Sequence, residues 1–185
     1  LVIFNLVQTI GFYGFASWVP VLLASEGLTF AKSLQYAFVI AIVNPIGPVA
    51  AMAAADRFER KTQIAVLALA IAAAGLVFAR ARVPAAILLA GASVAFLNAW
   101  FSSIFHSYQA ELFPTRVRAR AIGFVYSWSR LSAVFAGFVI SAILRAYGTA
   151  GVFAAIAAAM AVAALAVGLL GPRSTNVELE ALGAE

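Results

Sequence analysis

One arginine, Arg130, lies in the middle of a long apolar segment, where a permanent positive charge is unexpected. Residues 121–144 contain no other charged side chain. Arg130 follows Arg120 by ten residues, which is roughly 15 Å along a helix and therefore near the centre of a hydrocarbon layer about 30 Å thick. An arginine at that depth costs about 2.5–3.5 kcal/mol on insertion scales, and such a cost usually reflects function.

The neighbours of Arg130 favour the binding of an anion. Tyr126 and Ser127 lie on the same face of the expected helix, with Trp128 beside them. A guanidinium offers a planar fork of N–H donors, and a carboxylate is the anion that fits this fork. The alternative is a structural arginine that satisfies helix-end carbonyls or pairs with a carboxylate elsewhere in the protein.

Polar side chains also recur at helical spacing in three other segments. Residues four apart stack on one face of a helix, and stripes of this kind consist of Asn5, Thr9, Tyr13 and Ser17, of Asn98, Ser102 and His106 with Gln109 close by, and of Tyr36 and Asn44. Facing lipid would be costly for such stripes, so we expect them to line a shared, water-filled cavity. The alternative is that they join helices through hydrogen bonds worth about 0.6 kcal/mol each.

The ionisable groups limit what this cavity can do. All seven acids lie in loops, at segment ends or in the tail, namely Glu26, Asp56, Glu59, Glu111, Glu178, Glu180 and Glu185. A proton-relay carboxylate within the membrane would therefore belong to a part outside this chain. His106 is the one residue of the type that changes charge near neutral pH. Two roles stay open for it, one in proton coupling and one as a hydrogen-bonding lining residue.

The elements that position these residues are transmembrane helices. Of 185 residues, 65% are apolar and 10% are charged, whereas soluble domains carry roughly 25% charged residues. Runs almost free of charge, each near the ~20 residues that cross a bilayer, predict spans at about 1–25, 33–55, 62–79, 84–112, 119–145 and 149–171. Residues 1–171 thus form a six-helix bundle, and residues 172–185 form a tail.

The spans repeat in their character. The third and sixth are apolar on every face, as expected for lipid-facing support helices, whereas the other four carry the polar groups. This order predicts an all-α membrane protein of six transmembrane helices built as a three-plus-three repeat. Pro45 and Pro48 in the second span remove backbone donors and are expected to kink that helix.

Charge in the short loops indicates orientation rather than nucleic-acid binding, despite the net charge of +5. Seven basic residues lie in loops 56–61 and 111–120 and in the tail, against four on the opposite side. We therefore expect those loops and both chain ends to be cytoplasmic, in the cell membrane. The absence of cysteine excludes disulfides and thiolate metal sites, and we expect no metal and no cofactor. Leu1 begins inside an apolar run, so we expect the chain to be part of a longer protein.

Two loops resemble motifs of the major facilitator superfamily. DRFERK at residues 56–61 resembles its Asp-Arg-x-Gly-Arg-Lys/Arg loop, with Met52 and Glu59 in place of two glycines. ELFPTRVR, which begins at Glu111, resembles the Glu-x6-Arg and Pro-Thr-x-x-Arg pattern of sugar porters and metabolite:proton symporters. The resemblance implies a cytoplasmic gate of salt bridges that loosens during transport; its members would be Asp56, Arg57, Arg60, Lys61, Glu111 and Arg118. Simple anchoring of positive loops is the alternative.

Other segments extend the resemblance over the whole chain. GFYGFASWVP at residues 11–20 is similar to the seventh helix of metabolite symporters, SWSRLSAV around Arg130 to their eleventh helix, and the tail PRSTNVELEAL to their usual ending. The resemblance implies helices seven to twelve of a twelve-helix transporter, which works by alternating access against an N-terminal six-helix half outside this chain.

The function expected is transport of a small solute, an organic acid or other carboxylate metabolite, with protons as coupling ion and the lipid bilayer as surroundings. A sugar porter is the alternative, in which Gln8, Asn5 and Asn98 would bind hydroxyls. The residues assigned to substrate binding are Asn5, Gln8, Thr9, Tyr13, Asn98, Ser102, His106, Tyr126 and Arg130.

Two further classes are remote. Ser102 and His106 are spaced for an intramembrane serine protease, but no Gly-x-Ser-x-Gly elbow or oxyanion hole is evident. An anion channel would need a selectivity filter or a charged ring, and nothing resembles either. We therefore expect that the protein is not an enzyme.

Overall fold

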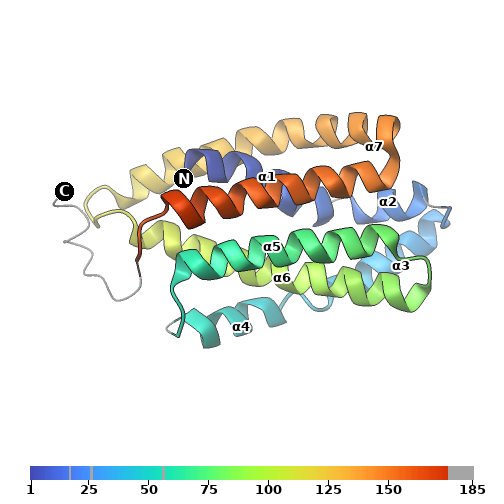
Figure 1. Ribbon diagram of the computed structural model, residues 1–185, viewed down its shortest axis with the longest axis horizontal. Helices are drawn as coiled ribbons and strands as arrows, with labels where there is room; N and C mark the ends of the chain where they lie inside the picture. Colours follow the sequence, from blue (N-terminus) through green and yellow to red (C-terminus); the bar gives the residue numbers. More distant parts are fainter. Residues whose placement is uncertain (17, 26, 56, 175–185) are drawn as a thin grey trace.

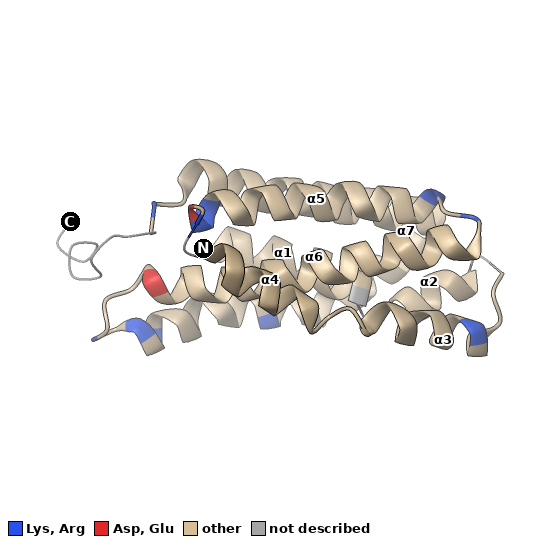
Figure 2. Ribbon diagram, turned by 90° about the horizontal axis from the view of Figure 1, so that it is seen from below, with Lys and Arg blue, Asp and Glu red and all other residues tan. Residues whose placement is uncertain are grey.

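The computed structural model describes residues 1–16, 18–25, 27–55 and 57–174, and these residues are helical apart from turns and short connections. In chain order the helices are α1 (Val2–Ala16), α2 (Val19–Ser25), α3 (Phe30–Ala41), α4 (Ile46–Ala55), α5 (Arg60–Arg80), α6 (Pro84–Glu111) and α7 (Arg118–Leu170). The helices run along the long axis of one bundle (Figure 1). Most of the basic and acidic residues lie at its two ends (Figure 2).

The number of membrane crossings follows from the lengths of these seven helices and from the breaks between them. Phe30–Ala55, Arg60–Arg80 and Pro84–Glu111 are each long and apolar enough to span a membrane, as is the pair Val2–Phe15 and Val19–Ser25, which is bent by 57°. Helix α7 has 53 residues, about 80 Å of helix, and therefore accounts for two crossings. The start of the chain and the end of α7 lie at the same end of the bundle (Figure 1), as an even number of crossings requires.

Glycine divides α7 at Gly148. This residue has φ 65° and ψ −169°, in the positive-φ region that glycine reaches without strain from a side chain. The helical arms 118–147 and 149–170 fold back on each other there (Figure 1).

Proline accounts for the break between α3 and α4. Residues 42–45 form a turn, and Pro45 has no N–H to continue the α3 hydrogen-bond ladder. The expected kink is therefore a complete interruption, and it leaves Asn44 in non-helical backbone halfway along the crossing.

Aromatic rings hold the helices that carry the polar stripes. Phe4 of α1 contacts Phe101 and Phe105 of α6, with ring centroids 5.8 and 4.6 Å apart. Phe78 of α5 lies 5.3 Å from the rings of both Phe15 in α1 and Phe153 in α7. All these rings are nearly inaccessible. These rings pack α1 against both α6 and α7, and the packing sets the positions of the polar residues on the three helices relative to one another.

The two expected support helices each have one buried face. In α5, Ile64, Ala68 and Ile71 are fully buried, whereas Val66 and Val77 are exposed. The arm 149–170 likewise buries Met160 and Ala163 and exposes leucines near its end. Both segments are apolar on all sides because one side faces protein and the other faces the lipid chains.

Candidate substrate-binding site

Arg130 is held at the centre of a cluster formed by α1 and α7. Its Nη1 donates to the hydroxyl of Tyr13 at 3.1 Å, and its Nη2 donates to the hydroxyl of Tyr126 at 2.9 Å. The guanidinium carbon also lies 4.8 Å from the centre of the Tyr126 ring. Arg130 itself is exposed on the surface of this bundle. The two tyrosines thus orient the guanidinium, and an anion that binds there would meet N–H donors that are already in position.

His106 brings α6 to the same cluster. Its Nδ1 lies 2.6 Å from the backbone oxygen of Ser102, and because a carbonyl only accepts, Nδ1 carries the hydrogen. The imidazole makes an edge contact with the Tyr126 ring, with 5.6 Å between centroids. Tyr13, His106, Tyr126 and Arg130 are therefore one cluster, which we call the Arg130 cluster.

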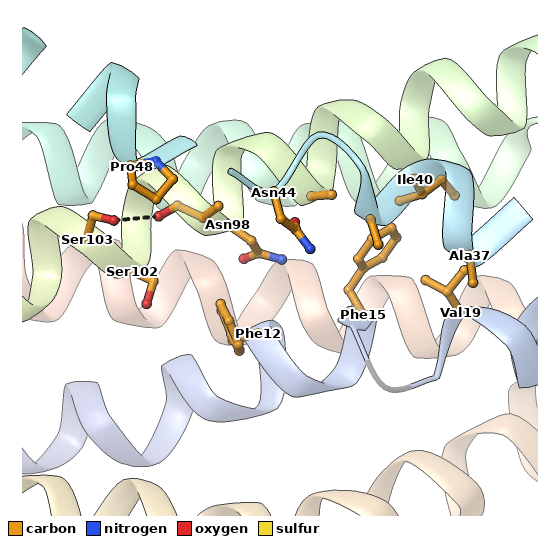
Figure 3. A pocket seen from close by; sticks show the side chains of 13 residues that line it. Phe12, Phe15, Val19, Ala37, Ile40, Asn44, Pro48, Asn98, Ser102 and Ser103 are labelled. Carbon is orange, nitrogen blue, oxygen red and sulfur yellow. Dashed lines mark hydrogen bonds between the residues drawn. The ribbon is translucent and has the colours of Figure 1, made fainter. Parts of the chain in front are cut away.

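A cavity of about 380 Å³ lies beside this cluster, between α6 and the two broken crossings. In Figure 3 the amides of Asn44 and Asn98 point into it from the α3–α4 break and from α6. The wall also includes Phe12, Phe15 and Ser102. The Phe12 ring lies 5.2 Å from that of Tyr13, so the cavity wall continues into the Arg130 cluster.

Asn98 is the polar residue of the cavity that most needs a partner. It is 4% exposed, and neither its Oδ1 nor its Nδ2 has a hydrogen-bond partner among the described residues. A buried amide left in this state costs free energy. An occupant of the cavity with hydroxyl, carbonyl or ring-nitrogen groups would recover that cost.

Of the other expected site residues of α1, Gln8 and Thr9 join helices, whereas Asn5 donates its amide N–H to the Leu1 carbonyl, four residues before it in the chain, at 3.1 Å. Thr9 donates to the Asn5 carbonyl at 2.8 Å, so the 2.6 Å bond between the Thr9 and Ser129 hydroxyls has Ser129 as donor. Gln8 donates to Ser129 as well, at 3.4 Å. Asn5, Gln8 and Thr9 are all buried, and the Oδ1 of Asn5 has no hydrogen-bond partner among the described residues. Their role in substrate binding stays a prediction, and Ser17, the fourth member of the stripe, lies outside the described residues.

Four residues of this region were not among those assigned to substrate binding from the sequence, although Asn44 belonged to a stripe that was expected to line a cavity. Phe12 and Phe15 were indistinguishable from core aromatics. Asn44 carried a signal, since it precedes Pro45 at an expected kink, where backbone and side chain turn toward an opening. Ser129 lies one residue before Arg130, and its spacing gave no indication that it meets Thr9.

The expected gate residues lie at the end of the bundle where α5 begins and α6 ends. Arg60 Nε is 3.1 Å from Glu111 Oε1, and both side chains are partly buried. Lys61 donates to the backbone oxygen of Gly171 at 3.0 Å. Arg118 instead binds its own loop, donating to the Phe113 carbonyl at 3.2 Å. Arg57 is exposed, and Asp56 lies outside the described residues.

Residues near the end of α7 close this end of the bundle further. Ser174 donates its N–H to Glu59 Oε1 at 3.0 Å, and the Tyr108 hydroxyl donates to the Pro172 carbonyl at 2.9 Å. Residues 171–174 thus lie across α5 and α6. Glu59, which replaces a glycine of the motif, has a contact of its own here.

A family model described as "Sugar (and other) transporter" matches residues 4–185. The chain belongs to this family. It therefore belongs to the major facilitator superfamily, a superfamily of transporters and not of enzymes, and it is a multi-pass membrane protein.

Relatives of this chain include transport proteins of bacteria. The putative metabolite transport protein YyaJ of Bacillus subtilis is 33% identical over 92% of this chain and 38% of the relative. The inner membrane metabolite transport protein YdjE of Escherichia coli is 30% identical over 95% of this chain and 39% of the relative. The niacin transporter NiaP of Acinetobacter baylyi is 25% identical over 93% of this chain and 39% of the relative. The chain thus spans about two fifths of the length of these relatives.

A solved structure agrees with the fold. The proton:xylose symporter XylE, bound to 6-bromo-6-deoxy-D-glucose, superimposes with a TM-score of 0.78 at 19% identity. The alignment covers 99% of this chain and 41% of XylE. The six-helix bundle is therefore half of a major facilitator fold.

The geometry also removes Ser102 as a nucleophile. Its hydroxyl lies 3.5 Å from His106 Nδ1, but that nitrogen already donates its hydrogen to the Ser102 carbonyl. An activated serine needs a histidine nitrogen with a free lone pair facing it.

The α1–α7 contact gives a direct test of which polar residues join helices. Ser129→Ala removes the cross-helix bonds to Thr9 and Gln8, and we expect it to lower the free energy of unfolding by about 1 kcal/mol. Ser127→Ala is the matched control, because that exposed hydroxyl bonds only to the Phe124 carbonyl of its own helix at 2.7 Å among its described contacts. Thermal unfolding in detergent measures both, and equal midpoints would contradict the assignment.

Proposed function

We propose that this chain works as the C-terminal half of a twelve-helix secondary transporter that moves a small carboxylate metabolite, together with protons, by alternating access. The observation that carries the proposal is the Arg130 cluster. A guanidinium that two tyrosines hold in place on the membrane-embedded face of a helix supports recognition of an anion.

The hydrogen-bond count of the cluster supports a carboxylate. A guanidinium has five N–H groups, and the two tyrosines accept two of them. Each tyrosine hydroxyl that accepts from Arg130 keeps its own hydrogen to donate. Three remaining N–H groups and two O–H groups are thus available, and a carboxylate has acceptor sites for about four of them.

The neighbouring cavity supports a substrate with an uncharged, flat or hydroxylated end. A volume of about 380 Å³ lies within the range of small-molecule sites. Phe12 and Phe15 contribute aromatic rings to its wall, and Asn44 and Asn98 offer donors and acceptors. Niacin, the named substrate of a relative, combines a carboxylate with a planar ring that bears an acceptor nitrogen, and we propose substrates of this type.

A sugar is the second candidate, because the amides favour it. Asn44, Asn98 and Ser102 line the cavity together, and amide and hydroxyl groups are suited to sugar hydroxyls. In that case Arg130 would donate hydrogen bonds to an uncharged sugar or would have a purely structural role.

Competing ligands separate the two candidates. Binding of nicotinate, benzoate, nicotinamide, D-glucose and D-xylose would be measured calorimetrically on the complete transporter in detergent. Nicotinate and nicotinamide differ in the group that Arg130 would recognise, so we expect nicotinate and benzoate to bind and nicotinamide to bind at least tenfold more weakly. Binding of the sugars without either carboxylate would replace the proposal with the sugar porter.

We propose further that the end of the bundle with Arg60 and Glu111 faces the cytoplasm and serves as the gate. The gate residues are Asp56, Arg57, Arg60, Lys61, Glu111 and Arg118. Ion pairs that are partly exposed contribute little individually, which suits contacts that must break when the halves rock. Both ends of the chain are cytoplasmic in this proposal, and the membrane is the cell membrane.

Single cysteines test this orientation directly, because the chain has none of its own. Phe58 and Val83 form a matched pair at opposite ends of α5, with exposures of 62% and 60%. In intact cells we expect a membrane-impermeant maleimide to label Val83→Cys and to label Phe58→Cys only after permeabilisation. The reverse pattern would invert the orientation.

A further inference from the structure

His106 has one ring nitrogen, Nε2, for which the described residues provide no hydrogen-bond partner. Nδ1 is held by the Ser102 carbonyl at 2.6 Å, which fixes the tautomer and leaves the lone pair on Nε2. The residue is exposed on the bundle surface, as Arg130 is. Tyr126 contacts both side chains, because Arg130 lies over its ring at 4.8 Å and the imidazole meets it edgewise at 5.6 Å.

The charged groups around His106 can be named element by element. Helix α7 contributes Tyr126 and Arg130, and α1 contributes Tyr13. Helix α4 has no ionisable side chain. Helix α3 has Lys32 and Tyr36. Five residues after His106, at the end of α6, Glu111 is paired with Arg60 of α5, and Arg80 lies in the last turn of α5, at the opposite end of that helix from Arg60.

Arg130 is the charge that decides the electrostatics of the cluster. A proton on Nε2 would add a second cation to the cluster in which Tyr126 contacts both side chains, and like charges disfavour each other. A carboxylate that binds at Arg130 offsets this repulsion, because its negative charge attracts both cations. Histidine is the side-chain type for which such a change falls within pH 5–8.

From this geometry we infer that His106 takes up the transported proton, binding it at Nε2 when a carboxylate binds at Arg130. The inference rests on the proposed function, and it names the coupling group within this half. The proton comes from water on the side where the substrate enters, forms an N–H bond at Nε2, and returns to water when the carboxylate leaves. One carboxylate and one proton then cross together with no net charge.

Linkage fixes the sign of the pH dependence. If carboxylate binding favours the protonated imidazole, protonation must favour carboxylate binding by the same factor. Affinity for a carboxylate should therefore rise as pH falls through the range in which histidine titrates, by up to about tenfold per pH unit. A neutral ligand should show no such rise.

Proton uptake on binding is the decisive measurement. Nicotinate or benzoate would be added to the complete transporter in weakly buffered detergent solution at pH 7 with a pH-indicator dye, and dissociation constants would be measured at pH 6, 7 and 8. We expect uptake of up to one proton per bound carboxylate. His106→Asn keeps an amide N–H near the Nδ1 position but has no titratable nitrogen, so we expect much less uptake, a flat pH profile and weaker binding at pH 6.

The outcomes distinguish this inference from the proposed function. Proton uptake by His106→Asn equal to that of the parent would overturn the inference, as would a parent that binds carboxylate without taking up protons. Failure of both carboxylates to bind the parent would instead overturn the proposed function. His106→Gln, with the amide N–H near the Nε2 position, serves as a second variant, and an unchanged thermal midpoint shows that each variant is folded.

Discussion

Arg130→Ala should reduce the affinity of the complete transporter for nicotinate and benzoate by at least about 100-fold. Hydrogen bonds to a charged group contribute about 1.5–3 kcal/mol each, and the substitution removes two or more of them. Each 1.4 kcal/mol is a factor of ten in affinity. The hydroxyls of Tyr13 and Tyr126 also lose the group that orients them. Calorimetric titration measures the effect.

Arg130→Lys separates charge from geometry in the same experiment. Lysine keeps the positive charge but offers a point charge without a planar fork, so it can no longer hold both tyrosines and a carboxylate together. We expect an affinity between those of the parent and the alanine variant. Undiminished carboxylate binding by Arg130→Ala, with an unchanged elution profile, would remove Arg130 from the substrate site.

Local spacing was enough to predict one side of the Arg130 cluster. Tyr126 and Arg130 are four residues apart on one helix, and this places them on one face in any α-helix. Tyr13 is 117 residues away, and no rule of spacing connects it to Arg130. Its position depends on how aromatic packing orients α1 against α7, which is a property of the whole bundle.

The stripe on α1 shows a second limit of the sequence. Thr9 and Tyr13 lie on the same line of the helix, yet Thr9 binds Ser129 inside the interface and Tyr13 reaches Arg130 at the surface. Both arrangements satisfy a polar side chain in a membrane. The sequence therefore predicts that such residues face away from lipid, but it does not predict whether they meet protein or solute.

The breaks in the helices likewise differ in how far the sequence predicts them, because one has a local cause and the other does not. The interruption of α3–α4 could be predicted because Pro45 acts through its own missing N–H. The bend between α1 and α2 was not predicted. Pro20 is the second residue of α2, and a proline near a helix start is compatible with the helix that follows it, so Pro20 alone did not show that a new helix begins there. Both breaks adjoin the cavity, since Asn44 lies in one of them and Phe15 and Val19 flank the other.

The close approach of α4 to α6 predicts a large effect on stability. A Cβ atom at Gly47 would lie 2.5 Å from the Ala99 Cβ and 2.7 Å from the backbone nitrogen of Trp100. Backbone atoms cannot move aside as a flexible side chain can, so Gly47→Leu must push α4 away from α6. We expect the free energy of unfolding to fall by about 3 kcal/mol or more. Thermal unfolding followed by tryptophan fluorescence measures it.

Gly123→Leu is the matched control, since a Cβ at Gly123 of α7 would meet nothing within 4 Å. There the substitution exchanges glycine for a better helix former, and we expect stability to stay the same or rise by up to about 1 kcal/mol. Function should separate the two variants as well. Asn44 and Pro48 adjoin Gly47 and line the cavity, so displacement of α4 should weaken nicotinate binding. A Gly47→Leu protein as stable as Gly123→Leu would show that α4 does not depend on this contact, and that the α3–α4 break is free to move relative to α6.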